Sequence, residues 1–547
     1  ASKYDRTIKA FNASGKGSPS DLAQTLDSSP VPVSVYSNNT KLVLNSVFGR
    51  LNYDYKNRYF ATASFRYDGS SSLGPDNRYG FFPGISAGWN MQEEKFWANV
   101  MPKFFSSLKL RGSYGVNGNL GTLGDFQAGG LYAGTTNGLP NSYNGQSAII
   151  NSQIANPGLK WEQSETINGG FDIGFNGDKI RIIGDFYNKL TSDLLTNLTL
   201  PSNSGFSTVL TNLGGLRSKG FELEVQANLY NQNDWKINVG ANVSHNTNTV
   251  EKLPFNGNTN NRIGGTEIYD VKSGTYKYVG GLQEGQKIGD FYAHKQLYIL
   301  STQAEADAYN LKVKDTYVTK TAANGGNPTG KKFAGDAVFE DTDNNGVIDS
   351  RDRQYMGNMF PTFVGGFNFD AAYKGFSLTV RTDYSLGATI YNEARARFLG
   401  QFQGNYGLLA ESAQAWQKEG DITDVPRYRW ADQTNQNNLF RSEASGAAYN
   451  TNMFQGNSRY YESGDYLCIR EITFSYNFPK SLVEKARLTS FRLYVTGSNL
   501  YYFTKYKGLS PEVQGIDGGS SLGLNAAGST GTYPVPRNII LGLNIGL

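Results

Sequence analysis

Strict alternation of apolar and polar residues recurs along this chain and constrains its fold more than any other feature. A clear example runs from Trp235 to Ser244, where every second residue is apolar or small and the residues between are mostly polar. Because successive side chains of a β-strand point to opposite faces, this period of two predicts strands with one apolar and one polar face. It predicts about 13 strands, which begin near Leu42, Tyr59, Phe82, Leu108, Thr166, Ile180, Phe221, Trp235, Thr362, Phe376, Leu467, Phe491 and Asn538.

The polar faces carry pairs of like charges, such as Glu222 with Glu224 and Lys109 with Arg111. Unpaired charge is expensive to bury in a dry core, whereas a water-filled lumen accommodates it. Only 38% of the residues are hydrophobic, and no apolar run approaches the roughly 18 residues that a membrane helix needs. These features favour an all-β fold, a transmembrane antiparallel β-barrel with lipid outside and water inside. The alternative is a soluble β-sandwich whose polar faces meet solvent.

Connections between the predicted strands are short at one end and long at the other. Short turns fall at residues 56–58, 176–178, 231–234 and 374–375, and long Gly- and Asn-rich segments fall at 116–160, 190–218, 248–361, 385–465 and 499–537. This asymmetry is typical of outer-membrane barrels, and a soluble sandwich rarely has several loops of such length. We therefore assign residues 1–39 to an extracellular loop segment, 40–247 to the first strands, 248–361 to a long extracellular loop and 362–547 to the closing strands.

The predicted strand count is odd. If the short turns are periplasmic, the first and last predicted strands both run toward the periplasm, and an odd number cannot close as a fully antiparallel barrel. Single-chain bacterial barrels have even numbers, up to about 22 in large transporters. The count therefore predicts that the chain is the C-terminal part of a 22-strand barrel.

Several classes of function are disfavoured by composition. The net charge of +4 over 547 residues gives no reason to expect nucleic acid as a partner. The single cysteine, Cys468, excludes a disulfide within the chain, and two histidines, His245 and His294, argue against a histidine-based metal site. The spacing of residues indicates no Ser-His-Asp arrangement, so we expect no enzyme. A soluble β-fold enzyme acting on glycans would need paired carboxylates at a cleft, which spacing alone does not reveal.

One segment has the pattern of a calcium-binding loop. Residues 341–352 place oxygen-bearing side chains at loop positions one, three, five, nine and twelve, with Gly346 at position six. Hard cations prefer such dense oxygen ligands, and position seven contributes a backbone carbonyl. The candidate Ca²⁺ ligands are Asp341, Asp343, Asn345, Val347, Asp349 and Asp352. The alternative is an Asx-rich turn in an extracellular loop.

Local sequences in the same order along the chain resemble the SusC/RagA family of TonB-dependent outer-membrane transporters. They are Phe65 to Ser71 with Asn77 to Pro83, Leu108 to Gly115, Asn156 to Glu162, Ser218 to Glu222, Gly335-Asp336 with Asp341 to Asp352, and Tyr533 to Arg537. The resemblance implies a barrel in the outer membrane of a Bacteroidetes-type bacterium. It implies import of oligosaccharides or peptides, with a SusD-like surface lipoprotein as a lid and TonB–ExbB–ExbD as the energy source.

Two expectations depend on what this sequence lacks. No TonB box and no plug are found in it, so we expect a separate plug-bearing N-terminal portion to make the contact with TonB. The alternative is a plugless or split barrel that acts as a structural scaffold subunit of an outer-membrane complex. Loop aromatic residues are candidates for stacking on sugars, with packing within the loops as the alternative; they are Tyr132, Trp416, Trp430, Tyr460 and Tyr461.

Overall fold

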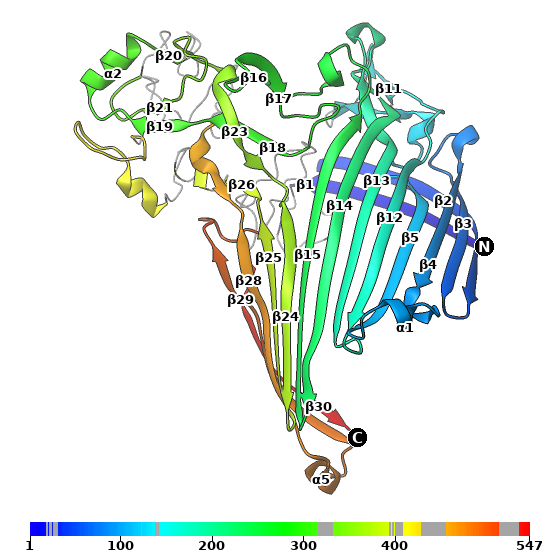
Figure 1. Ribbon diagram of the computed structural model, residues 1–547. Coiled ribbons are helices and arrows are strands. Elements are labelled where there is room, and N and C mark those ends of the chain that lie inside the picture. Colours follow the sequence, from blue (N-terminus) through cyan, green and yellow to red (C-terminus); the bar gives the residue numbers. More distant parts are fainter. Residues whose placement is uncertain are drawn as a thin grey trace.

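One curved antiparallel sheet dominates the computed structural model (Figure 1). The structure describes residues 1–17, 20, 25, 31–121, 123–136, 139–140, 142–315, 332–392, 395–396, 399, 409–427, 456–512 and 535–547. The sheet has 14 strands, and each pairs with its neighbour in sequence order, from β1 to β30. The strands are β1 (Ser2–Lys16), β2 (Val31–Tyr55), β3 (Tyr59–Ser70), β4 (Tyr79–Asn90), β5 (Phe105–Asn119), β12 (Glu162–Phe175), β13 (Ile180–Thr199), β14 (Thr208–Gln232), β15 (Trp235–Lys252), β24 (Phe363–Tyr373), β25 (Phe376–Leu386), β28 (Tyr466–Asn477), β29 (Ser490–Thr504) and β30 (Asn538–Gly546).

The register places one kind of residue on each face, as the alternation predicts. Val225, Ala241 and Phe367 lie directly opposite one another on β14, β15 and β24 and form part of the apolar face. One residue away in the same register, Asn242 pairs with Glu224 on one side and with Gly366 on the other. Residues paired across an antiparallel ladder share a face. The polar residues of neighbouring strands therefore form the other face of the sheet without a break.

Aromatic side chains form two bands on the apolar face. At the end with short turns, Trp235 stacks on Tyr373 with ring centroids 4.4 Å apart. At the other end, the ring of His245 lies between Phe221 and Phe363, at 5.8 and 5.4 Å. Trp235 and His245 are ten residues apart on β15, which is about 33 Å along the strand and about 25 Å across a membrane at a tilt of roughly 40°. This height matches the apolar band of an outer-membrane barrel.

The tight turns at one end have the backbone that hairpins require. Asn233 and Asp234 join β14 to β15 with φ of 49° and 66°, and Lys374 and Gly375 join β24 to β25 with φ of 46° and 92°. Positive φ at both central residues matches the right-handed twist of the flanking strands. We call this end the turn end and the opposite one the loop end.

Two buried clusters lie in the layer of segments at the loop end, outside the large sheet, and Figure 1 shows this layer above the strands. One cluster comprises Ile299, Ala337, Phe339 and Ile348, and another comprises Tyr391, Ala396, Leu399, Ala415, Val425 and Tyr460. The short strands outside the large sheet are β6 (Leu131–Ala133), β7 (Thr135–Thr136), β8 (Leu139–Pro140), β9 (Ser142–Tyr143), β10 (Gln146–Ser147), β11 (Ile150–Gln153), β16 (Thr266–Asp270), β17 (Thr275–Val279), β18 (Asp290–His294), β19 (Gln296–Ile299), β20 (Lys314–Asp315), β21 (Ala337–Phe339), β22 (Val347–Ile348), β23 (Arg353–Asn358), β26 (Thr389–Tyr391) and β27 (Tyr461–Ser463).

Helices are short wherever the structure describes the chain. They include the α-helices α1 (Trp97–Val100), α2 (Gln303–Asn310) and α5 (Lys480–Val483). Short 3₁₀ turns include η8 (Ser350–Asp352), η9 (Ala410–Gln414) and η10 (Ser458–Tyr460). Among the described residues, no helix combines the length and apolar character needed to cross a membrane.

Each of the predicted strand starts falls within a strand of the sheet or, for Thr362, one residue before it. Residues 1–39, assigned to an extracellular loop segment, contain β1 and the first part of β2, which are paired strands of the sheet and not an irregular loop. The sheet thus has 14 strands instead of 13, and the argument from an odd count no longer holds. The predicted loop at 190–218 is also wrong for most of its length, since β13 continues to Thr199 and β14 begins at Thr208.

Candidate functional site

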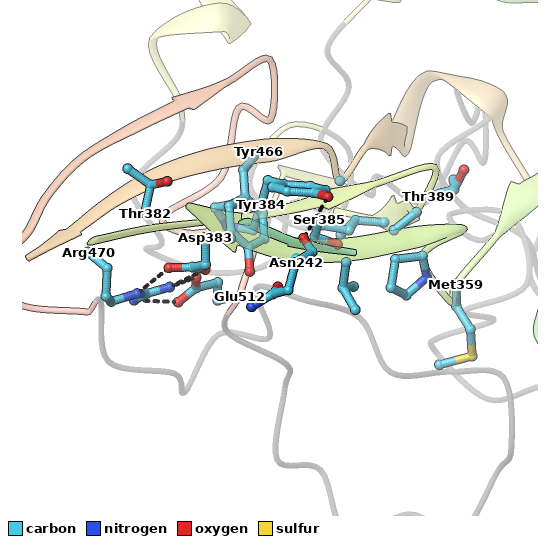
Figure 2. A pocket seen from close by; sticks show the side chains of 18 residues that line it. Asn242, Met359, Thr382, Asp383, Tyr384, Ser385, Thr389, Tyr466, Arg470 and Glu512 are labelled. Carbon is cyan, nitrogen blue, oxygen red and sulfur yellow. Dashed lines mark hydrogen bonds and ion pairs between the residues drawn. The ribbon is translucent and has the colours of Figure 1, made fainter. Parts of the chain in front are cut away.

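A pocket opens on the polar face near the loop end, where β15, β24, β25 and β28 lie side by side. It has a volume of about 720 Å³ and is lined by residues that include Asn242, Gly366, Asp383 and Tyr466 (Figure 2). Gly366 pairs with Asn242 on one side and with Asp383 on the other. A Cβ atom at Gly366 would lie 2.5 Å from the carbonyl oxygen of Thr382. The close approach of these two strands therefore depends on glycine at this position.

Arg470 occupies a break in the ladder between β25 and β28. Arg381 pairs with Glu471 and Thr382 with Ile469, so Arg470 is the extra residue of a bulge in β28. Bulges redirect a side chain relative to the regular alternation. Arg470 consequently reaches the pocket, where its guanidinium lies between the carboxylates of Asp383 and Glu512 (Figure 2).

The hydrogen bonds around Arg470 are dense. Its Nε donates to Asp383 Oδ1 at 2.6 Å and its Nη2 donates to Asp383 Oδ2 at 2.7 Å. Its Nη1 donates to Asn499 Oδ1 at 2.7 Å and to Glu512 Oε2 at 3.2 Å, and Nη2 also contacts Glu512 Oε1. The hydroxyl of Tyr502 lies 3.3 Å from Nη1 and donates to Glu512 Oε2 at 3.0 Å. We call Asp383, Arg470 and Glu512 the Arg470 cluster.

The alternation pattern did not identify the residues of this pocket. The one local signal was the pair Arg470-Glu471, which places two charged residues in succession within an otherwise alternating strand. Such a break in alternation indicates a bulge, and bulges are common near functional sites. It does not reveal the partners, because Asp383 and Glu512 lie 87 and 42 residues away in the chain.

The predicted calcium loop lies in the loop-end layer, and the structure brings three of its carboxylates together. One oxygen from each of Asp341, Asp343 and Asp352 lies within 4.8 Å of the others. Gly346 takes a φ of 78° and donates its N–H to Asp341 Oδ2 at 2.8 Å. This tight reversal is the role that the motif gives to glycine at position six.

The other predicted ligands are placed differently. The side-chain oxygen of Asn345 accepts the N–H of Val347 at 2.7 Å, and its amide donates to Asp343 Oδ2 at 2.9 Å. Asp349 is outside the group of three, since its carboxylate accepts from Arg351 Nε at 3.0–3.1 Å. Val347 belongs to β22 and pairs with Lys314.

Asp352 is the most buried of the candidate ligands, with 1% of its surface exposed. Its carboxylate accepts the N–H groups of Thr342 at 2.7 Å and Asp349 at 2.8 Å. Burial, together with the neighbouring carboxylates of Asp343 and Asp341, raises the pKa of Asp352 to about 6. Concentrated negative charge of this kind is what a bound cation would neutralise.

The loop aromatics predicted to stack on sugars differ in exposure. Tyr132 is 70% exposed and Tyr460 is fully buried. Trp416 packs against the cluster of Ile299 and donates its indole N–H to Ser301 O at 3.0 Å. Tyr461 is partly buried and packs against the cluster that contains Tyr460. Trp430 lies outside the described residues. Tyr460 and Trp416 therefore serve loop packing, and Tyr132 keeps an accessible ring.

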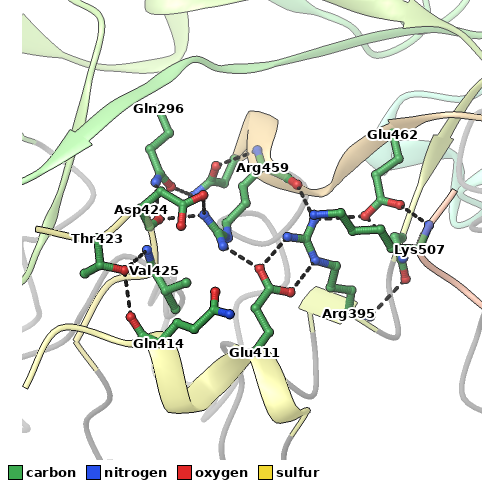
Figure 3. Close-up of polar contacts among 12 residues, drawn as sticks. Gln296, Arg395, Glu411, Gln414, Thr423, Asp424, Val425, Arg459, Glu462 and Lys507 are labelled. Carbon is green, nitrogen blue, oxygen red and sulfur yellow. Dashed lines mark hydrogen bonds and ion pairs between the residues drawn. The ribbon is translucent and has the colours of Figure 1, made fainter. Parts of the chain in front are cut away.

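A network of buried charges holds the loop-end layer together (Figure 3). Glu411 Oε1 lies 2.5 Å from nitrogens of both Arg395 and Arg459, and Arg395 also pairs with Glu462 at 2.9 Å. The two arginine side chains are only 8% and 6% exposed. The hydrogen bond from Arg395 is the main cause that lowers the pKa of Glu411 to about 2. This network joins η9 to η10, the turn directly before β27, and its role is to stabilise the layer.

Comparison with known proteins places this architecture in a family. Residues 3–319 match the family model described as TonB dependent receptor-like, beta-barrel. The chain belongs to this family. It is 31% identical over 523 residues to TonB-dependent receptor P3 of Formosa agariphila, an alignment that covers 94% of this chain and 46% of that protein. It is 27% identical to TonB-dependent receptor SusC of Bacteroides thetaiotaomicron, covering 92% of this chain and 44% of SusC.

The solved structure of the RagAB peptide transporter has the same fold. It superposes with a TM-score of 0.71 and 22% sequence identity over 100% of this chain and 52% of the compared chain. The chain thus spans about half the length of the relatives it matches. These findings confirm an outer-membrane β-barrel fold of the SusC/RagA type. Long loops of such barrels face the exterior and short turns the periplasm, so the pocket opens near the extracellular end of the inner wall.

Proposed function

We propose that the chain forms the closing part of the barrel of a TonB-dependent importer that takes up oligosaccharides or peptides. The observation that carries this proposal is the polar inner wall with a pocket near its extracellular end, in a chain of the TonB-dependent receptor family. A ligand that enters from the loop end would meet hydrogen-bonding groups on this wall and would need no catalytic residue. Enzymatic activity is therefore no part of the proposal.

The proposal includes partners that this chain does not itself supply. A plug-bearing N-terminal portion would block the lumen and contact TonB–ExbB–ExbD, and a SusD-like lipoprotein would cover the loop end. The support is similarity to SusC and to the protein of the RagAB structure, together with the half-length coverage of both. The extensive loop-end layer, built around two buried clusters, offers a preformed surface for such a lid.

The test combines co-purification with uptake. The chain is purified from detergent-solubilised outer membranes, and everything that co-purifies is identified by peptide mass spectrometry. We expect a stoichiometric plug-bearing portion and a lid-like lipoprotein. We also expect loss of oligosaccharide or peptide uptake when either the encoding gene or TonB is deleted. Co-purification of other membrane-assembly proteins, with uptake unaffected, would instead support a scaffold subunit.

We also propose that the loop of residues 341–352 binds Ca²⁺ on the extracellular side. The support is the loop spacing together with the convergence of Asp341, Asp343 and Asp352. Calcium titration of the whole detergent-solubilised protein should release or absorb heat and should protect the loop from proteases. Asp343→Asn should abolish both effects. Asp349→Asn is the matched control, because Asp349 pairs with Arg351 and should leave most of the binding intact.

A further inference from the structure

We propose that the Arg470 cluster is a selectivity site of the inner wall, which accepts uncharged, hydroxyl-bearing segments of the imported ligand and excludes acidic ones. This inference rests on the proposed import function and specifies it further. It follows from three features of the pocket. Every N–H group of Arg470 is already hydrogen-bonded, the carboxylates outnumber the guanidinium, and further polar groups line the pocket around the cluster.

Arg470 has no donor left for a ligand. A guanidinium has five N–H groups, and the acceptors around Arg470 are the two oxygens of Asp383, the two of Glu512, Asn499 Oδ1 and the hydroxyl of Tyr502. A free arginine would bind an incoming carboxylate or sulfate in a bidentate manner. Here an anion would first have to displace Asp383 or Glu512 from Arg470.

The cluster also carries a net negative charge. Two carboxylates and one guanidinium give −2 + 1 = −1, and all three groups line the same pocket. Clefts lined by one sign of charge concentrate the field and repel ligands of that sign. Neutral ligands are therefore favoured over acidic ones at this cluster.

The pocket presents acceptors to a neutral ligand. A carboxylate has about four lone-pair sites, so Asp383 and Glu512 keep accepting capacity beyond their bonds to Arg470. Asn242, Ser385 and Tyr466 add polar groups to the lining. The ring of Tyr466 meets that of Tyr502 edge to face at 5.9 Å, which fixes its orientation. Hydroxyl donors of a sugar ring match the carboxylates, and its apolar face matches an aromatic ring.

The experiment measures selectivity with matched probes. The whole importer, purified with its co-purifying partners, is titrated calorimetrically with neutral hexasaccharides of several hexoses, with the C6-carboxylated form of each, and with hexapeptides. We expect at least one neutral hexasaccharide to bind at least tenfold more tightly than its carboxylated form. The double variant Asp383→Asn with Glu512→Gln changes the cluster charge from −1 to +1 and should reduce this ratio by about tenfold or more, as expected for hydrogen bonds to charged groups.

The control variant is Asp185→Asn. Asp185 belongs to a similar group, in which Arg111 pairs with Asp172 and Asp185 at 2.9 and 3.0 Å, outside the pocket. Its substitution should leave the selectivity ratio unchanged. If the double variant fails to fold, Glu512→Gln alone keeps both hydrogen bonds between Asp383 and Arg470 and should shift the ratio in the same direction.

Three results would overturn the proposal: tighter binding of carboxylated sugars or peptides, an unchanged ratio in the double variant, or no binding of any neutral hexasaccharide. Failure of the import function is distinguishable. If an acidic sugar or a peptide is bound and its uptake requires TonB, import stands and only this selectivity is wrong. If no probe is taken up in a TonB-dependent manner, the import function itself fails.

Discussion

Arg470 and Asp383 form a bidentate ion pair between adjacent strands of the sheet, with Nε and Nη2 donating at 2.6 and 2.7 Å. Both side chains are about one-third exposed, at 33% each. The pair therefore lies at a wet wall and not in a dry core, and its contribution to stability is reduced by solvent screening. The main effect of this ion pair is to fix the geometry of the pocket.

Substitution of Arg470 should nevertheless destabilise the barrel. Arg470→Gln would leave Asp383 and Glu512 facing each other without the intervening charge, so we expect the free energy of unfolding to fall by about 1–2 kcal/mol, measured by urea unfolding in detergent. Arg66→Gln is the control, because the side chain of Arg66 is 57% exposed in its pair with Asp68. An equal loss of unfolding free energy in both variants would contradict the claim that Arg470 stabilises the barrel by separating the two carboxylates.

Glycine at position 366 should be required for the same pocket. Gly366→Ala places Cβ 2.5 Å from a backbone carbonyl that has little room to move. We expect a loss of about 1–3 kcal/mol in unfolding free energy, as for other overpacked positions. Gly112→Ala in β5 is the control, since nothing lies within 4 Å of the place that its new methyl group would take. Unchanged stability of Gly366→Ala would show that β24 and β25 are less closely packed than this distance implies.

The lipid and lumen faces of β15 should respond oppositely to charge. Val239 lies on the apolar face between the two aromatic bands, and Asn238 is its neighbour on the polar face. Val239→Lys should reduce folding stability in lipid vesicles by about 2–4 kcal/mol, whereas Asn238→Lys should have little effect. The measurement is the folded fraction on unheated gels across a urea series. Similar losses for both lysines would contradict the assignment of the two faces.

Glu411 should make the loop-end layer sensitive to acid. Its pKa is lowered to about 2 in the folded protein, and an unperturbed glutamate titrates at about 4.3. The stabilisation is therefore complete above about pH 4.3 and is lost as the pH falls toward 2. Hydrogen exchange of residues 409–427 in the whole protein should accelerate over this range.

The variant Glu411→Gln should show the acid effect at neutral pH. It leaves the buried guanidinium groups of Arg395 and Arg459 without their shared carboxylate, and we expect a local loss of about 3 kcal/mol. Exchange in the sheet strands should not change. Wild-type exchange rates at residues 409–427 in this variant would mean that the network does not stabilise the layer.

The strands were predictable from sequence because each face of a barrel wall has one constant environment. β1 was missed because its pattern is broken: Phe11 falls on the opposite face from Tyr4 and Ile8, and Arg6 interrupts the apolar positions. The calcium-like loop could be recognised in the sequence for a different reason, since its carboxylates lie within twelve consecutive residues, and its binding of Ca²⁺ stays a prediction. The structure brings Asp341, Asp343 and Asp352 together, as the spacing predicts, and engages Asp349 with Arg351.

The pocket could not be predicted in the same way. Its groups come from strands that become neighbours only through the register of the whole sheet, and Glu512 follows the end of β29. A single bulge decides whether Arg470 faces lipid or lumen, and the sequence of one strand does not specify which residue the ladder skips. The sequence predicts the local periodicity of each strand, but it does not predict the register between distant strands that brings the residues of this pocket together.

The length of β14 has a consequence for what the cell surface presents. The strand runs from Thr208 to Gln232, and its loop-end aromatic, Phe221, lies near its middle. The 13 residues from Thr208 to Gly220 extend about 40 Å beyond that aromatic band, at 3.3 Å per residue. The wall thus rises above the membrane as a rigid collar, and antibodies, phages and proteases would first encounter hydrogen-bonded sheet and the layer mounted on it.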